Sequence, residues 1–172
     1  MTRILFITST RIGDAVLSSG LIAHLVKRHP DARFTIACGP LPADLFRDVP
    51  GLDRIHVMRK RPMGRHWIAL WRSVVGTRWD LVVDLRGSAI AWLLRSKDRK
   101  VAKRYPGHRV AAAARVLGLD APLDPQLFVA APTRARAEQI LGEGAVLAVG
   151  PSANWIGKEW PWQNFAELAR RL

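Results

Sequence analysis

The chain has 172 residues, of which 49% are hydrophobic and 24% charged, a balance that is typical of a globular protein and excludes a disordered tail. The single cysteine, Cys38, excludes an internal disulfide, and the five histidines lack the spacing of metal ligands, so we expect no metal and no cofactor. The apolar run at residues 4–7 is too short for a signal peptide, and no stretch approaches the roughly 18 apolar residues of a membrane span. We therefore expect a cytoplasmic protein.

The formal net charge of +13 predicts an anionic partner: a nucleic acid, a phosphorylated molecule or an acidic membrane surface. Residues 54–79 hold seven basic residues and no acid, and residues 95–109 hold seven more with only Asp98 opposing them. A solvated surface in an arginine-rich proteome is the alternative, but ordinary surfaces intersperse both signs of charge. The acid-free stretch therefore favours a binding surface.

Short apolar runs rich in β-branched residues alternate along the chain with longer helical patterns. The predicted strands are residues 4–8, 34–38, 54–58, 80–85 and 100–103, and the predicted helices are residues 14–29, 43–48, 67–77 and 109–117. Strict alternation of this kind predicts an α/β fold with a Rossmann-like, doubly wound parallel sheet. For this sheet we assume the common strand order 3-2-1-4-5.

Two breaks interrupt the rest of the chain: clustered prolines at residues 122–132 and a Gly-Glu-Gly sequence at residues 142–144. A helix is predicted between them at residues 133–141, and a strand at 145–149 and a helix at 162–172 follow. One strand and one helix cannot bury their own apolar faces. We therefore predict a first domain at residues 1–141 and the incomplete beginning of a second α/β domain at residues 142–172.

Ligands of an open parallel sheet bind beyond the carboxyl ends of its strands, where the strand order reverses. With the assumed order, the loop that carries Arg11, Gly13 and Asp14 meets the loop that carries Arg86 and Gly87 at that point. Asp14 is then a candidate general base, although an aspartate in a first helical turn more often caps the helix or offsets its dipole. The first loop has neither the P-loop pattern nor three spaced glycines, so it does not predict a nucleotide there.

Residues 150–161, Gly-Pro-Ser-Ala-Asn-Trp-Ile-Gly-Lys-Glu-Trp-Pro, join the last predicted strand to the last helix. Small residues and Lys158 ahead of a helix N-terminus suit a phosphate group, because backbone N–H groups and the ammonium group can both reach it. A plain connecting loop, in which Trp155, Trp160 and Trp162 pack as hydrophobic side chains, is the alternative.

Three motifs in this order resemble glycosyltransferase family 9, the bacterial heptosyltransferases that build the lipopolysaccharide inner core. The first is the strand and serine-containing loop that end in Gly13-Asp14, the second is Trp-Asp-Leu-Val-Val-Asp-Leu-Arg-Gly at residues 79–87, and the third is the loop at residues 150–161. Family members usually carry glutamine at the position of Arg86, and histidine and glycine at the positions of Gly150 and Ser152.

The resemblance implies the N-terminal half of a GT-B architecture, in which two Rossmann-like domains face each other across a cleft. It implies a metal-independent, inverting glycosyltransferase that moves a sugar from a nucleotide-sugar, ADP-heptose, to an anionic inner-core acceptor. Asp14 would remove the proton of the acceptor hydroxyl, and Lys158, with Ser152 and Asn154, would bind the donor phosphates. The predicted acceptor-binding residues are Arg11, Gly13, Arg59, Lys60, Arg61, Arg65 and Arg86.

The partners that the resemblance implies are the nucleotide-sugar, the anionic glycolipid and the cytoplasmic surface of the inner membrane, on which the protein would be peripheral. Because family members are about twice this length, we expect the chain alone to be inactive and to self-associate through the apolar face that a missing domain leaves. The alternative is a basic α/β module that binds nucleic acid or an anionic membrane without catalysis. The sequence has no helix-turn-helix, zinc-finger or RNA-recognition motif, so nucleic acid is not the expected partner.

Overall fold

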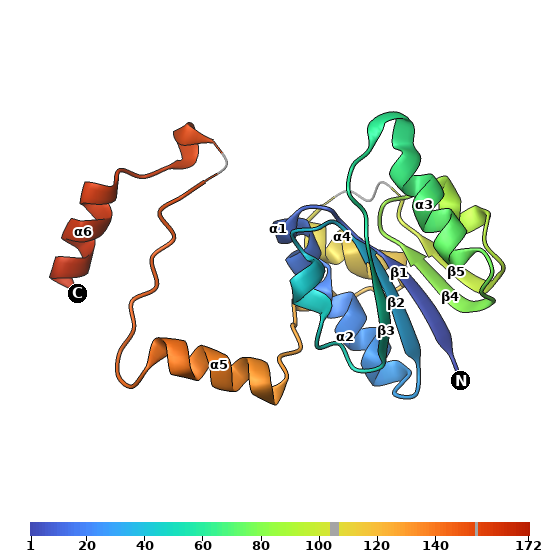
Figure 1. Cartoon of the computed structure of the whole chain (residues 1–172), viewed down its shortest axis with the longest axis horizontal. Coiled ribbons are helices and arrows are strands. Elements are labelled where there is room, and N and C mark those ends of the chain that lie inside the picture. Colours follow the sequence, from blue (N-terminus) through green and yellow to red (C-terminus); the bar gives the residue numbers. More distant parts are fainter. Residues whose placement is uncertain (104–106, 154) are drawn as a thin grey trace. The chain divides into compact units, whose positions relative to one another are not determined.

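The computed structural model describes residues 1–103, 107–153 and 155–172 of the chain. They form two compact units, Met1–Ala130 (unit 1) and Ala131–Leu172 (unit 2), which can be followed by colour in Figure 1. Within the described ranges, no helix combines the length and the apolar character needed to cross a membrane.

Unit 1 is built on a sheet of parallel strands in the order β3-β2-β1-β4-β5 (Figure 1). The strands are β1 (Arg3–Ile7), β2 (Arg33–Cys38), β3 (Leu52–Val57), β4 (Trp79–Asp84) and β5 (Ser96–Val101). β1 lies in the middle, where Ile7 is opposite Ala37 of β2 on one side and opposite Asp84 of β4 on the other. The predicted fold class and the assumed strand order are confirmed.

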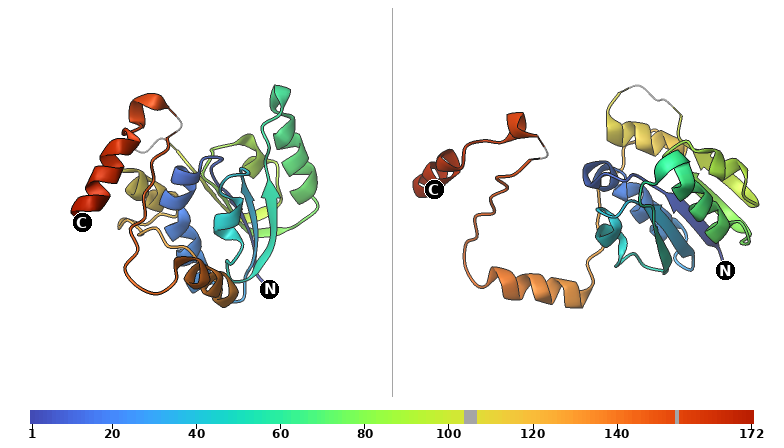
Figure 2. Two further views of the ribbon diagram at one scale, coloured as in Figure 1. Left: turned by 60° about the vertical axis from the view of Figure 1, so that its left-hand side comes forward. Right: turned by 45° about the horizontal axis from the view of Figure 1, so that its top comes forward.

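Helices cover both faces of the sheet, and the left view of Figure 2 shows the blue helix α2 and the green helix α3 on opposite sides of the strands. One layer contains α1 (Ile12–Leu17), α2 (Ser19–Arg28), the 3-10 helix η1 (Ala43–Phe46) and α4 (Arg109–Val116). The other contains α3 (Arg65–Val74), which follows the 3-10 helix η2 (Pro62–Gly64), and the 3-10 helix η3 (Ala89–Trp92). Successive side chains of a strand point to opposite faces, so Ile4 and Phe6 are buried in the first layer and Leu5 and Ile7 in the second.

Two predicted elements of unit 1 differ in detail from the structure. The single helix predicted at residues 14–29 is divided into α1 and α2 at Ser18, whose buried hydroxyl donates to the Ala15 carbonyl at 3.0 Å and also contacts Thr8 Oγ1 at 3.0 Å. The fifth strand begins at Ser96 and not at residue 100. Its sequence, Ser-Lys-Asp-Arg-Lys-Val, has no apolar run, because this outermost strand is only partly buried.

A segment without regular secondary structure, residues 119–130, closes unit 1 over α2. Leu123 packs against the core of that layer, and the Gln126 N–H donates to Ser19 Oγ at 2.9 Å. At Gly20 the segment approaches α2 so closely that a Cβ would lie 2.3 Å from the carbonyl oxygen of Asp124. Only glycine fits at this point of α2.

Unit 2 contains α5 (Ala131–Leu141), the 3-10 helix η4 (Ile156–Lys158) and α6 (Trp162–Arg171). Trp160 and Phe165 pack edge to face, with ring centroids 5.0 Å apart. The strand predicted at residues 145–149 is wrong, because these residues have no regular secondary structure and the Leu147 side chain is 53% exposed. A strand needs a neighbour to complete its hydrogen bonds, and the described part of unit 2 contains no other strand.

The boundary between the two compact units lies after Ala130, at the proline-rich segment. The predicted domain boundary lies one helix later, after residue 141. The helix between the two positions, α5, belongs to unit 2. The assignment of residues 142–172 as the beginning of a nucleotide-sugar-binding domain stays a prediction.

Candidate active site

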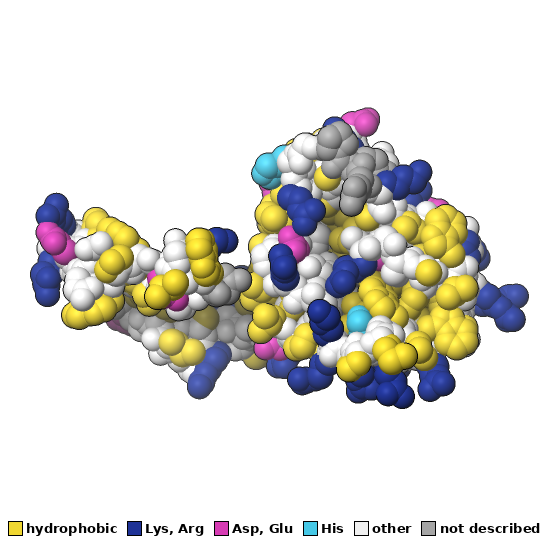
Figure 3. All heavy atoms as spheres, turned by 90° about the horizontal axis from the view of Figure 1, so that it is seen from above, with side chains coloured by type: hydrophobic (Ala, Val, Ile, Leu, Met, Phe, Trp, Pro, Cys, Tyr) yellow, Lys and Arg dark blue, Asp and Glu magenta, His cyan; other side chains and the backbone are white. Residues whose placement is uncertain are grey.

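A pocket of about 520 Å³ opens at the carboxyl ends of β1 and β4, next to the point where the strand order reverses. Figure 3 looks onto this end of the sheet, where dark blue Lys and Arg side chains gather. The loop after β1, the helix α1, the loop after β4, the residues after β5 and the helix α4 all contribute to its wall. The polar residues that line the pocket are Thr8, Ser9, Thr10, Arg11, Asp14, Ser18, Arg86, Lys103 and Arg109.

Asp14 is the carboxylate of this pocket. It lies in the first turn of α1, and its side chain is 33% exposed. Its Oδ2 accepts a hydrogen bond from Ser9 Oγ at 3.4 Å, and its Oδ1 lies 3.2 Å from Arg109 Nη2. These partners come from the preceding loop and from α4, and among the described residues no side chain caps the N-terminus of α1. The carboxylate is therefore directed into the pocket and is not held by its own helix.

The loop after β4 is shaped by a second, fully buried carboxylate, Asp84. Its Oδ1 accepts from the Arg86 N–H at 2.8 Å, and its Oδ2 accepts from the N–H and the hydroxyl of Ser88 at 2.7 and 2.6 Å. Burial raises the pKa of the Asp84 carboxyl, although these hydrogen bonds favour its charged form. Gly87 takes φ +60 within the turn, a conformation that favours glycine. Asp84 thus fixes the backbone that presents Arg86 to the pocket.

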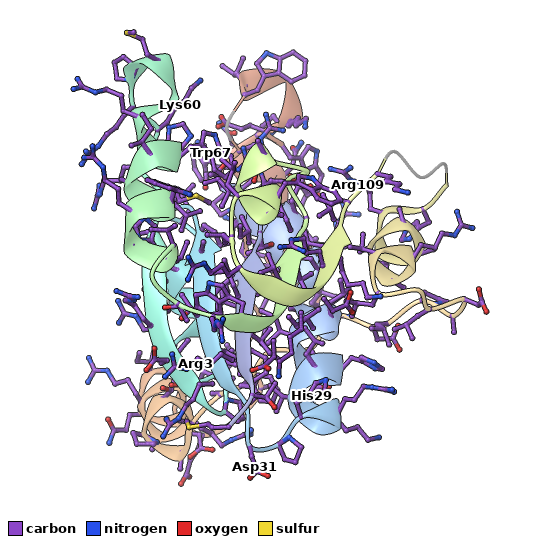
Figure 4. The ribbon with its side chains drawn as sticks, turned by 90° about the vertical axis from the view of Figure 1, so that its right-hand side faces the viewer. Arg3, His29, Asp31, Lys60, Trp67 and Arg109 are labelled. Atoms are coloured by element: carbon purple, nitrogen blue, oxygen red, sulfur yellow. The ribbon has the colours of Figure 1, made fainter. Side chains whose placement is uncertain are left out.

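Among the described residues, four cationic side chains line the pocket around Asp14: those of Arg11, Arg86, Lys103 and Arg109. Arg109 is the first residue of α4, where the positive end of the helix dipole disfavours a cation. Figure 4 labels Arg109 with Lys60 and Trp67 at one end of unit 1, and Arg3, His29 and Asp31 at the opposite end. One carboxylate among four cations leaves an excess of positive charge, so the pocket suits an anionic ligand.

Metal-ligating side chains are not grouped in the described ranges, where no three or more His, Cys, Asp or Glu residues come together as a metal site would require. The groups that the pocket offers to a ligand are therefore hydroxyls, guanidinium and ammonium groups and the Asp14 carboxylate.

The sequence of residues 86–172, half of the chain, matches a family model described as glycosyltransferase family 9 (heptosyltransferase). The chain belongs to glycosyltransferase family 9. No curated protein is significantly similar to it in sequence.

Solved structures of three other proteins have the fold of this family-9 chain. A family-9 glycosyltransferase from Veillonella parvula has a TM-score of 0.72 at 16% identity, over 98% of this chain and 59% of its own. The E. coli heptosyltransferase WaaC, solved with ADP, has a TM-score of 0.67 at 16% identity, over 99% and 64%. The E. coli ADP-heptose lipopolysaccharide heptosyltransferase II has a TM-score of 0.63 at 20% identity, over 99% and 61%. The present chain thus spans between 59% and 64% of the length of these structures.

The predicted donor-binding residues of the family-9 chain lie in unit 2. Lys158 is the last residue of η4, its side chain is exposed, and its backbone N–H donates to the Trp155 carbonyl at 2.9 Å. Ser152 is also exposed, and Asn154 lies outside the described residues. Their role in binding donor phosphates stays a prediction.

The predicted acceptor-binding residues fall into two groups in the structure. Arg11 and Arg86 line the Asp14 pocket, and the exposed Gly13 precedes Asp14 in α1. The remaining residues are exposed and do not line this pocket: Arg59, Lys60 and Arg61 lie between β3 and η2, and Arg65 is the first residue of α3.

Sequence reasoning did not identify Ser9, Lys103 and Arg109 as residues of the site. Lys103 and Arg109 belong to the second basic run, but only the path of the chain after β5 brings them to β1. Arg104, from the same run, lies outside the described residues. One signal in the sequence could have identified Arg109. It is a basic residue at the start of a predicted helix, where the helix dipole makes a cation electrostatically unfavourable.

Proposed function

We propose that this family-9 chain carries the acceptor side of an inverting, metal-independent glycosyltransferase. The reaction moves a heptose-like sugar from ADP-heptose to a hydroxyl of an anionic lipopolysaccharide core acceptor. Two observations support the donor class: the family itself, and the similar solved structures of E. coli WaaC with ADP and with ADP-2-deoxy-2-fluoro heptose.

The observation that carries the proposal is the environment of Asp14, a partly exposed carboxylate among Arg11, Arg86, Lys103 and Arg109 in one pocket. The cations hold the phosphate and carboxylate groups of the acceptor, so that one acceptor hydroxyl lies against Asp14. The carboxylate takes the hydroxyl proton while the oxygen attacks the anomeric carbon of the donor, and the bond from that carbon to the diphosphate breaks. Attack from the face opposite the leaving group inverts the configuration.

Departure of the nucleoside diphosphate leaves negative charge on its terminal phosphate oxygen. We assign Lys158, assisted by Ser152 and Asn154, to this phosphate, because a cation placed where charge develops lowers the barrier to the reaction. Arg109 has a positioning task, since its guanidinium lies 3.2 Å from Asp14 Oδ1 and orients the carboxylate in the pocket. We also propose that transfer needs the part of the family fold beyond this chain.

The experiment joins residues 1–172 to the C-terminal segment of a family-9 heptosyltransferase and measures ADP release from ADP-heptose in the presence of a lipopolysaccharide core acceptor. Asp14→Ala and Asp14→Asn should each lower turnover by about 10²–10⁴, the usual contribution of general base catalysis. Asp31→Asn, at the opposite end of unit 1, is the matched control and should leave turnover unchanged. Near-normal turnover of Asp14→Asn in a correctly folded protein would show that Asp14 is not the base.

A second measurement tests the donor separately. Calorimetry should detect binding of ADP-heptose in preference to UDP- and GDP-sugars, and Lys158→Ala should weaken that binding while Asp14→Asn leaves it unchanged. Equal affinity for all three nucleotides would contradict the assigned donor class.

A further inference from the structure

Helix α3 has apolar side chains on two different faces. Leu70 and Val74 are fully buried against the sheet, as expected for the core face of an amphipathic helix. Ile68 and Trp71, on the outward side, are 50% and 36% exposed. The described residues of unit 1 therefore leave these two apolar side chains only partly covered.

This outward face borders an open groove of about 500 Å³ between α3 and η3, which we call the α3–η3 groove. Its wall is almost entirely apolar, and within the part of the chain that the structure describes Arg86 is its one ionisable lining residue. Leu93 lines it at 62% exposure, and the neighbouring Trp92 is 67% exposed. In Figure 3 the yellow side chains at the lower right lie over this part of unit 1, with dark blue side chains along their border. The residues that line the groove are Trp67, Ile68, Trp71, Ser88, Ile90 and Leu93, together with Ala89 and Arg86.

Exposed basic side chains lie on and just before the helix that forms one wall of the groove. Arg61, Arg65 and Arg72 lie in or next to α3, are exposed, and belong to the stretch of residues 54–79 that contains no Asp or Glu. None of the ion pairs between described residues involves them. The guanidinium of Arg86 lies over the ring of Trp67, 5.4 Å from its centroid.

The turn before α3 extends the same surface. Met63 is 96% exposed and takes φ 52, a left-handed conformation that is uncommon for a residue other than glycine. A large apolar side chain is thus presented to solvent beside Arg61 and Arg65, ahead of the outward face of α3.

We infer that the α3–η3 groove and its basic border dock the protein on an anionic phospholipid bilayer. Tryptophan is favoured at the interface between headgroups and acyl chains, where its apolar ring and its polar N–H are both satisfied. Arginines around exposed Trp, Ile, Leu and Met side chains form the pattern of an interfacial membrane-binding surface, in which charge attracts the leaflet and apolar side chains insert.

Two other occupants fit the surface less well. The cores of protein interfaces are depleted of charge, and a protein partner would have to supply acidic groups around an apolar centre. Nucleic acid would match the arginines, but the aliphatic side chains of Ile68 and Leu93 offer bases neither hydrogen bonds nor ring stacking. An anionic lipid surface accounts for both parts of the pattern.

Docking in this way has a geometric consequence for the proposed acceptor. Arg86 lines both the α3–η3 groove and the Asp14 pocket, so the two openings are adjacent. A bilayer on the groove places the headgroup layer beside the pocket, where a glycolipid acceptor can reach Asp14 without leaving the membrane. The docking itself does not depend on transfer, because no groove side chain is assigned to the chemistry apart from Arg86.

The test is sedimentation of the 172-residue protein with vesicles of phosphatidylcholine alone or of phosphatidylcholine mixed with phosphatidylglycerol. We expect binding only to the mixed vesicles, and binding that weakens as salt is added. Arg65→Gln combined with Arg72→Gln should lower partitioning roughly thirtyfold, the effect of two basic side chains at an anionic leaflet. The control is Arg28→Gln combined with Arg33→Gln, which removes the same charge at the end of α2 and the start of β2. This pair should have little effect on vesicle partitioning.

The apolar contribution is tested with Ile68→Ser and Leu93→Ser together, which should lower partitioning at least tenfold. Ile140→Ser, at an exposed position of α5, is the control. Docking is refuted if the two arginine pairs behave alike, if phosphatidylcholine alone binds equally, or if Arg65 and Arg72 affect duplex DNA or RNA binding but not vesicle binding. Asp14→Asn should bind vesicles normally, so failure of the transfer proposal and failure of docking remain distinguishable.

Discussion

The close approach at Gly20 leads to a quantitative prediction for Gly20→Ala. In a helix, alanine is favoured over glycine by about 1 kcal/mol, so on propensity alone the substitution should stabilise α2. The new Cβ, however, would lie 2.3 Å from Asp124 O and 2.9 Å from Leu123 O, whereas ordinary contacts begin at 3.4 Å. Residues 123–124 must therefore withdraw from α2 by about 1 Å, since both obstacles are backbone atoms.

Overpacking of this kind costs about 1–3 kcal/mol, and displacement of the segment also weakens the hydrogen bond from Gln126 to Ser19, which contributes about 1 kcal/mol. After the gain in propensity is subtracted, Gly20→Ala should lower the free energy of unfolding by about 1–3 kcal/mol. Gly13→Ala, in α1, is the matched control, because a Cβ there meets no atom within 4 Å and its φ is not positive. The control should be neutral or more stable by up to about 1 kcal/mol.

Urea denaturation followed by circular dichroism measures both variants against the wild type. If Gly20→Ala were as stable as Gly13→Ala, the segment at residues 119–130 would not pack tightly on α2, and the tertiary contact described above would be wrong. Hydrogen exchange at the Gln126 amide offers an independent reading, because loss of its hydrogen bond should speed exchange in Gly20→Ala alone.

Three further predictions concern polar groups that are fully or partly buried. Asp84→Ala leaves the backbone donors of Arg86 and Ser88 without their acceptor and should lower the free energy of unfolding by about 2–3 kcal/mol in urea titrations, whereas Asp31→Ala should not. Burial raises the pKa of the Cys38 thiol to about 12, so iodoacetamide at pH 8 should label the protein only after denaturation. Burial, and secondarily Arg54, lowers the pKa of His56 below 6.5, so its NMR titration should fall below that value. The stability linked to His56 is present above pH 6.5 and is lost as the pH falls from there toward the lowered pKa; a His56→Gln variant should lose this part of the pH dependence.

Much of unit 1 could be predicted because its central strands are buried on both faces. The runs at β1, β2 and β4 are almost continuously apolar, and the common strand order then brings the loops of Asp14 and Arg86 together, as the structure confirms. β5 was misplaced because an outermost, partly buried strand has no apolar period to detect. The strand predicted at residues 145–149 failed for the opposite reason, since an apolar run alone does not supply a neighbouring strand.

The composition of the pocket was only partly predictable. Arg86 lies two residues after β4, and Asp14 lies in the first turn of the helix that follows β1, so the strand order places both at the same edge of the sheet. Lys103 and Arg109 reach the pocket because the chain returns after β5 and enters α4, and no local pattern in the sequence fixes that path. Asp84 was correctly assigned to a strand. Its hydrogen bonds to the backbone N–H groups of Arg86 and Ser88 in the following turn, however, are visible only in the side-chain geometry of the structure.

The charged sequence of β5 also bears on how copies of this protein meet. An outermost strand exposes unpaired N–H and C=O groups along one side, and such a row invites another strand to join it. Lys97, Asp98, Arg99 and Lys100 occupy consecutive positions of β5, and charged side chains on an outermost strand oppose continuation of the sheet into a second molecule. If the chain self-associates, extension of the sheet at this edge is thus an unfavourable route. The infrared amide I band of β-structure should then be the same in a dimer as in the monomer.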